Sequence, residues 1–117
     1  MLSNKSKNKV TGNLGEEKAC QYLLKKSYKI LNRNFNCKLG EVDIIARNRN
    51  VIVFIEVKTR KDEEFGRPSE AVNFYKQRKI KNIAMVYLKL KGKIDSPIRF
   101  DVIEVLNDDI NHIENAF

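Results

Sequence analysis

Two helices are predicted where apolar residues recur every three or four positions along the chain. Residues 11–28, TGNLGEEKACQYLLKKSY, carry one such stripe, with Thr11 or Asn13 as the residue that caps the helix. A second stripe begins at Ile80, and Gly92 is of the residue type that commonly ends a helix. Each segment therefore has one apolar face that must be buried against another part of the chain.

Strands are predicted where β-branched and aromatic residues gather in short runs. Residues 28–35, YKILNRNF, form the first run, and residues 37–60 form a hairpin closed at Arg47–Asn50. Residues 97–105, PIRFDVIEV, form a last strand, and the tail after them is too short and mixed to assign. The order of helix, three strands, helix and strand predicts an α/β domain with a mixed sheet flanked by helices.

The charge of the chain favours a polyanionic partner. Lysine and arginine number 23 against 15 aspartates and glutamates, so the formal net charge is +8. Nucleic acid is favoured over a membrane, since no segment is apolar enough to span a bilayer or resembles a secretory signal. A soluble basic protein without such a partner is the alternative. At 117 residues the chain is long enough for one core.

The chain is expected to divide into a short arm and one domain. Residues 1–10, MLSNKSKNKV, predict a flexible basic arm, and residues 11–117 a single domain. Cys20 and Cys37 lack metal-type spacing, so the reducing cytoplasm is the expected compartment. Cys20 is expected to be a small core residue.

The run VIVFIEVKTR, residues 51–60, contains charged residues where a buried strand is expected. Glu56 and Lys58 point to the same face of this strand, because side chains alternate along it. An ionised group in such a place costs several kcal/mol unless it is paired or bound. The two residues are therefore expected to have partners.

The hairpin supplies a candidate partner for Glu56. We expect a turn centred on Asn48 and Arg49. That register sets Asp43 opposite Phe54 and diagonal to Glu56, with their Cβ atoms about 7 Å apart. The two carboxylates would then be close enough to share an ion.

Glu16 is another charged residue on a face expected to be apolar. Its neighbours at i+3, i+4 and i+7 are Ala19, Cys20 and Leu23. Glu17, by contrast, falls at the edge of the stripe. Glu16 is therefore expected to point toward the sheet, and the alternative is a glutamate that caps its own helix or reaches solvent at the first turn.

Carboxylates beside a lysine suit a hard divalent cation such as Mg²⁺, which takes oxygen ligands and keeps several waters. Asp43 and Glu56 would hold the metal, which would lower the pKa of a bound water and neutralise charge on a phosphate. Lys58 would orient the attacking water or stabilise the transition state. The alternative is a cross-strand salt bridge of Glu41 or Glu56 with Lys58.

Six motifs together resemble one known family: GNLGEEKACQYL, GEVDIIA, FIEVKTR, FGRPSEAV, KQRKI and RFDVIEV. This is the YraN-like family of small bacterial proteins, in the restriction-endonuclease-like PD-(D/E)XK nuclease superfamily, which is related to Holliday junction resolvases. The similarity runs from about Gly12 to Val105.

The resemblance implies an αβββαβ core and a site that binds Mg²⁺ or Mn²⁺. Carried over by motif, the site residues are Asp43, Glu56 and Lys58. Glu16 corresponds to a helix carboxylate that often joins them, and Gln77 to a supporting polar group of the second helix. The proline of the superfamily's name is absent before Asp43.

These observations predict a cytoplasmic, metal-dependent endonuclease that acts on DNA, with branched or damaged DNA as candidate substrates. One alternative is a non-catalytic nucleic-acid-binding module with the same fold, and another is a structural protein whose basic face meets an acidic protein. No membrane partner is expected, and a homodimer is considered because resolvase relatives are dimers. The residues expected to contact nucleic acid are Lys76, Gln77, Arg78, Lys79, Lys81 and Arg60.

Overall fold

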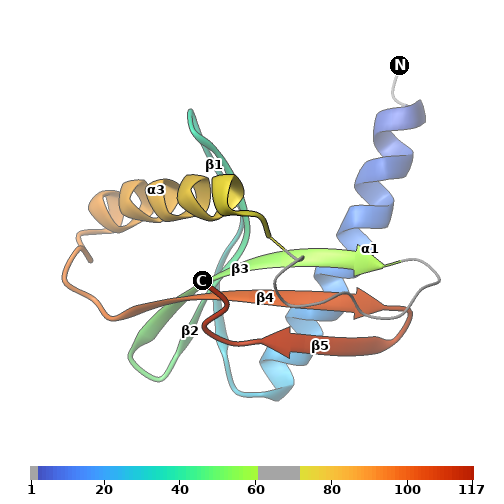
Figure 1. Cartoon of the computed structure of the whole chain (residues 1–117). Helices are drawn as coiled ribbons and strands as arrows, with labels where there is room; N and C mark the ends of the chain where they lie inside the picture. The colour runs from blue at the N-terminus through green and yellow to red at the C-terminus, as the bar shows by residue number, and fades with distance from the viewer. Residues whose placement is uncertain (1–2, 61–71) are drawn as a thin grey trace.

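The computed structural model describes residues 3–60 and 72–117, with the backbone alone described for residues 3–13. Its elements form one five-stranded sheet with a helix on each face (Figure 1). They are α1 (Ser3–Lys25), β1 (Lys29–Cys37), β2 (Gly40–Asn48), β3 (Val51–Arg60), α3 (Phe74–Lys91), β4 (Ile98–Leu106) and β5 (Asp109–Ile113). The predicted α/β class with an αβββαβ order is confirmed.

The strands lie in the sheet in the order in which they occur in the chain. β3 and β4 are parallel, and every other neighbouring pair is antiparallel. The parallel pair needs a crossover connection, and α3 is the helix within it. No helix in the described part of the chain is long and apolar enough to cross a membrane.

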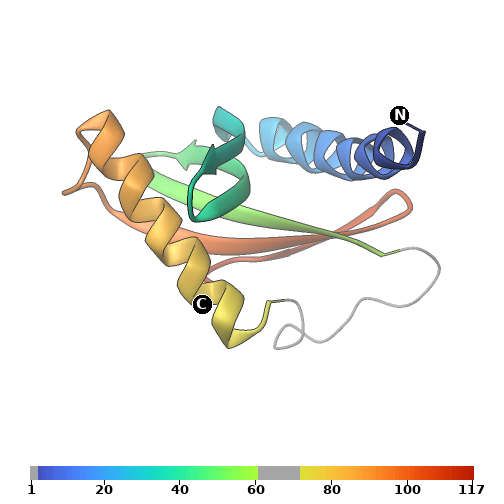
Figure 2. The same ribbon diagram turned by 90° about the horizontal axis from the view of Figure 1, so that it is seen from above.

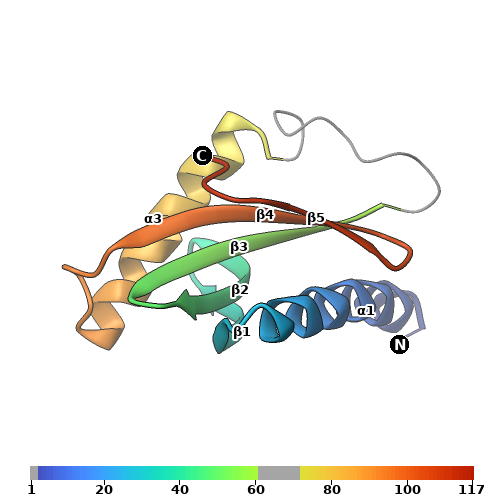
Figure 3. The same cartoon turned by 90° about the horizontal axis from the view of Figure 1, so that it is seen from below.

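Each helix covers its own face of the sheet, as Figures 2 and 3 show from opposite sides. The α3 face packs Ile83 and Leu88 against Phe54 of β3, whereas the α1 face packs Leu23 against Ile55. Because β3 is buried on both faces, it appears in the sequence as a continuous apolar run. This central strand therefore provides a rigid support for the charged residues near its end.

The first helix differs from its prediction at its beginning. It starts at Ser3, whereas a start capped by Thr11 or Asn13 was expected, so that boundary is wrong. The limit between the predicted arm and the domain consequently falls inside α1. The flexibility predicted for residues 1–10 stays a prediction.

The β2–β3 hairpin also differs in register. Asn48 pairs with Val51, so the turn consists of Arg49 and Asn50, with Arg49 in the left-handed region at φ 59°. The predicted turn was one residue too early, and the pairing of Asp43 with Phe54 is wrong because Ile45 lies opposite Phe54. Edge strand β5 was not assigned from the sequence at all.

Candidate functional site

The pairing of β2 with β3 ends before both strands end. Ile44 and Ile55 are the last paired residues, and beyond them β3 continues beside β4 alone. At this point Val57 donates its backbone N–H to Asp43 Oδ2 at 2.8 Å. A carboxylate thus takes the hydrogen bond that a paired strand would accept, and this places Asp43 beside Glu56.

A cavity of about 220 Å³ lies between this end of the hairpin and α3. Its lining residues are Glu41, Asp43, Glu56, Lys76, Lys79, Ile80 and Ile83. Glu56 is almost fully buried and forms an ion pair with the Nζ of Lys76. The cavity therefore combines carboxylates with ammonium groups, at the junction of a strand and a helix.

Lys76, and not Lys58, is the ammonium that meets Glu56. Lys58 is half-buried on the same strand but does not line the cavity, and the described contacts include no ion pair of Lys58 with Glu41 or Glu56. The salt bridge considered as an alternative is therefore wrong in its partner. Lys76 lies four residues before Ile80 and so continues the apolar stripe of the helix, a signal that could have identified it.

The ammonium groups of the cavity compensate the charge of its carboxylates only in part. Burial, followed by the charge of Glu56, raises the pKa of Asp43 to about 7, against an ordinary value of 3.8. The N–H of Val57 acts in the opposite direction, but it does not compensate. An added cation would relieve this crowding of carboxylates.

Glu16 reaches the same region from α1. Its side chain is buried, and its Oε1 has no hydrogen-bond partner among the described residues. The nearest guanidinium nitrogen, Nη2 of Arg33, lies 4.0 Å away. Burial raises the pKa of Glu16, and the charges of Glu41 and Glu56 act in the same direction. Because α1 starts at Ser3, the alternative of a first-turn cap is wrong.

A glycine lets α1 bring Glu16 this close. A Cβ atom on Gly15 would overlap the Oγ1 of Thr59 on β3. The next turns pack Cys20 into the core, as predicted, while Glu17 remains exposed and pairs with Arg33 at 2.9 Å. The adjacent glutamates therefore have different surroundings because only one of them faces the sheet.

The donor set fits a hard divalent cation in its chemistry. Asp43 and Glu56 offer oxygen atoms in a crowded acidic pair, and Glu16 has a buried oxygen nearby that accepts no hydrogen bond from the described residues. As placed, however, the side chains of the described residues include no group of three or more His, Cys, Asp or Glu that could hold a metal ion. Asp43 and Glu56 are the residues that could hold Mg²⁺ or Mn²⁺, with Glu16 as a nearby third carboxylate.

Other residues expected to contact nucleic acid have contacts within the chain. Gln77 donates its Nε2 at 3.0 Å to the carbonyl that precedes the helix cap. Arg78 lies over the ring of Phe74, and Lys81 lies over the ring of Phe100. Their role toward a phosphate stays a prediction.

Arg60 is held more firmly than the basic residues of α3. Its Nη2 and Nε donate to Oε2 of Glu104 at 2.6 and 3.0 Å, and Glu104 is fully buried. Asn111 of β5 donates to the other oxygen at 3.0 Å. Residues 97–105 were predicted to form a strand, but this network was not anticipated.

Asp101, on β4, is a second buried carboxylate that was not anticipated. It accepts two hydrogen bonds from Arg99 at 2.9 Å and one from the N–H of Asn115 at 2.9 Å. His112 Nε2 is hydrogen bonded to it at 2.7 Å, and His112 Nδ1 to the hydroxyl of Tyr22 at 2.9 Å. Burial acts to raise the pKa of Asp101, but the hydrogen bonds outweigh it and hold that pKa below its usual range.

Fold and site agree with the class of protein that the motifs resemble. The αβββαβ order, with an acidic pair where β2 and β3 separate, is consistent with the nuclease superfamily that the motifs resemble. The model of the family described as "Uncharacterised protein family UPF0102" matches residues 15–105. The chain belongs to this family.

Curated relatives of the family cover almost the whole chain. A UPF0102 protein of Caldanaerobacter subterraneus subsp. tengcongensis is 53% identical over 116 residues, which cover 93% of this chain and 95% of the relative. One from Caldicellulosiruptor saccharolyticus is 52% identical over 112 residues, covering 91% and 95%. One from Geotalea uraniireducens is 46% identical over 119 residues, covering 97% and 94%.

Proposed function

We propose that this chain is a divalent-metal-dependent endonuclease that hydrolyses phosphodiester bonds in DNA. The observation that carries the proposal is the acidic pair of half-buried Asp43 and buried Glu56, which lines a cavity together with Lys76. A structural protein has little use for an acidic pair that raises the pKa of one member to about 7. Such a pair is expected instead in a site that binds a cation and a phosphate.

Each residue of the cavity has a role that follows from its position. Asp43 and Glu56 would hold Mg²⁺ or Mn²⁺, which when bound supplies a water of lowered pKa and neutralises charge on the phosphate. Val57 fixes the orientation of the Asp43 carboxylate through its N–H. The apolar β3 residues before Glu56 hold that side chain rigidly.

The lysines would act on the substrate. Lys76 and Lys79 line the cavity and would bind oxygen atoms of the phosphate as point charges. Lys58, two residues beyond Glu56 on the same face, would orient the attacking water or stabilise the charge of the transition state. The expected compartment is the cytoplasm, in keeping with the free Cys20 and Cys37.

The test is cleavage of end-labelled four-way junction, flap and linear duplex DNA with Mg²⁺, Mn²⁺ or EDTA. The wild-type protein should cleave at least one substrate when a metal is present. Asp43→Asn and Glu56→Gln should lower the rate by at least about 100-fold. Glu16→Gln should lower it less, and the exposed neighbour Glu17→Gln is its matched control.

Two results would contradict the proposal. One is the absence of cleavage on every substrate, and the other is equal cleavage by the wild-type protein and Glu56→Gln. A non-catalytic binding module is the second candidate, favoured by the six lysine or arginine residues of α3, a helix without aspartate or glutamate. It predicts DNA binding that weakens steeply with salt and does not change on addition of Mg²⁺.

A further inference from the structure

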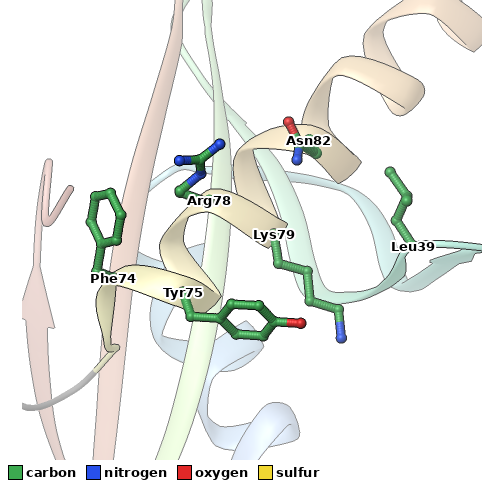
Figure 4. A pocket seen from close by; sticks show the side chains of 6 residues that line it. All are labelled: Leu39, Phe74, Tyr75, Arg78, Lys79 and Asn82. Carbon is green, nitrogen blue, oxygen red and sulfur yellow. The ribbon is translucent and has the colours of Figure 1, made fainter.

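The first turn of α3 forms one side of a larger pocket, next to the carboxylate cavity. Its volume is about 520 Å³, within the range of about 300–1,000 Å³ that is typical of ligand sites. Figure 4 shows its six lining residues, which are Leu39, Phe74, Tyr75, Arg78, Lys79 and Asn82. Aromatic, basic and amide side chains thus share one concave surface, and its lining residues within 3–60 and 72–117 include no carboxylate.

The two aromatic residues of this pocket are not part of the core. Phe74 is 69% exposed and Tyr75 is 77% exposed, whereas Phe54 and Phe100 are buried. The helix begins at this point with a firm cap, since Asn73 accepts the N–H of Lys76 at 2.8 Å. The rings are therefore presented to solvent from a fixed backbone, although burying them would have been favourable.

Cationic groups lie beside both rings. The guanidinium of Arg78 lies 5.8 Å from the centre of the Phe74 ring. Tyr75 and Lys79 extend from α3 toward the side on which Leu39 lies (Figure 4). Exposed rings alternating with Lys and Arg are typical of surfaces that stack nucleotide bases and bind the phosphates between them.

The charge of α3 argues against a second copy of the chain as the occupant. The helix has six basic residues and no acidic one, so two copies joined through this face would bring like charges together. A polyanion has the complementary charge. Unpaired bases, unlike a closed duplex, also offer the flat apolar faces that Phe74 and Tyr75 can cover.

The pocket is continuous with the candidate active site. Lys79 lines both cavities, and Tyr75 directly precedes Lys76, the partner of Glu56. Gly40 permits this arrangement, because a Cβ atom there would lie 2.7 Å from Cε of Lys79. A strand that entered the cavity would therefore have its neighbouring nucleotides over the first turn of α3.

We propose that Phe74 and Tyr75 stack on unpaired bases of DNA, while Arg78 and Lys79 bind the adjoining phosphates. The inference rests on the proposed function and makes it more specific. The substrate class is single-stranded DNA, or DNA with a single-stranded flap or gap next to the bond that is cut. Asn82, on the same surface, can donate and accept hydrogen bonds at a base edge.

The experiment measures DNA binding in EDTA by fluorescence anisotropy, so that it does not depend on cleavage. Labelled oligothymidine and a blunt duplex are compared for the wild-type protein, Phe74→Ala and Tyr75→Ala. Leu90→Ala, which removes an equally exposed apolar side chain at the other end of α3, is the control. Each aromatic substitution should weaken oligothymidine binding roughly tenfold and leave duplex binding unchanged.

A second readout detects stacking directly. The chain has no tryptophan, so Tyr75→Trp introduces a single indole. Its emission should be quenched by oligothymidine and not by the duplex. Equal losses on both DNAs, no loss with either alanine variant, or an unquenched indole would each overturn the stacking proposal.

The outcomes also separate this inference from the nuclease itself. If stacking fails but metal-dependent cleavage depends on Glu56, the nuclease proposal stands alone. If stacking holds but nothing is cleaved, the surface belongs to a binding module. Sedimentation provides the remaining test: a wild-type dimer that Phe74→Ala with Tyr75→Ala converts to monomer would show that a second copy occupies the surface, and it would overturn the proposal.

Discussion

Asp43 on β2 and Asp101 on β4 have the same carboxyl group in opposite electrostatic surroundings. Asp101 accepts hydrogen bonds from Arg99 and Asn115 and pairs with His112, and its pKa is held low. Asp43 has one backbone donor and a second carboxylate beside it, and its pKa is raised to about 7. The charge of Asp101 is compensated by its hydrogen-bond partners, whereas the charge of Asp43 is compensated only in part.

The difference distinguishes a structural carboxylate from a functional one. Buried charges with a complete set of partners hold elements together, in this case β4, β5 and the C-terminal turn. A buried charge without them costs stability, which is expected where the missing partner is a ligand. Removing the charge of Asp101 should therefore lower the stability of the fold, whereas removing the charge of Asp43 should raise it.

The largest effect is expected for Asp101→Asn. Removing this charge leaves the guanidinium of Arg99 without its buried carboxylate partner, and the unfolding free energy at pH 7 should fall by about 3 kcal/mol. Urea unfolding followed by circular dichroism measures it, with the exposed Asp95→Asn as the control. A loss below about 1 kcal/mol would mean that the network contributes little to the fold.

Asp43→Asn should have the opposite sign. The folded pKa of about 7 lies above the ordinary 3.8, so wild-type stability should fall as pH rises from about 4 to about 7 and then level off. Asparagine cannot ionise but can still accept the N–H of Val57. At pH 8 in EDTA the variant should be more stable than the wild type by roughly 1–3 kcal/mol.

The same pair of proteins at about pH 3, below the ordinary 3.8, provides the control for Asp43. Below the unfolded pKa both states of the wild type bind the proton, so the two stabilities should converge. A variant that is less stable than the wild type at pH 8 would show that the charge of Asp43 is compensated after all.

Lys76→Met tests the ammonium that partly compensates the acidic pair. Glu56 is buried, but the side chain of Lys76 is 43% exposed, so water screens the loss and about 1 kcal/mol of stability is expected to go in EDTA. Addition of Mn²⁺ should recover the lost stability, because a bound cation stabilises the folded state. Lys81→Met, on the same helix, should behave as the wild type with and without Mn²⁺.

The smallest net effect is expected for Gly15→Ala, which tests how the packing of α1 against β3 positions Glu16 near the site. The new Cβ would overlap Thr59, and the cost of overpacking is partly offset by the better helix propensity of alanine. A net loss of about 1 kcal/mol is expected in thermal unfolding. Combined with Thr59→Ala, which removes the overlap, the same substitution should instead stabilise the protein.

Much of the fold followed from the local pattern of residues. Val51–Arg60 was predicted as a strand because its first five residues are all β-branched or aromatic, and α3 ends where predicted because Gly92 adopts φ 65°. β5 was missed because it has only five residues and three of them are polar. Its strand conformation depends on pairing with β4. The start of α1 was missed because residues 3–10 lack an apolar stripe.

The candidate site followed from the pattern in part. Glu16 and Glu56 were recognised because each places a charge among apolar neighbours. The turn position was not, since Asn48, Arg49 and Asn50 are all suited to turns and only the packed sheet decides which two form it. Lys76 was placed with the basic cluster, although its position four residues before Ile80 sets it on the apolar stripe of the helix, and only the packed structure shows that its side chain reaches Glu56.

The sequence by itself therefore determined which segments become helices and strands, and which residues carry charge into apolar surroundings. These properties depend on neighbours a few positions apart, and their signal is local. The tertiary structure decided which charges meet. It paired Glu56 with Lys76 from a distant helix, gave Asp101 several hydrogen-bond partners, and set Asp43 beside a second carboxylate, because such contacts depend on how distant segments pack together.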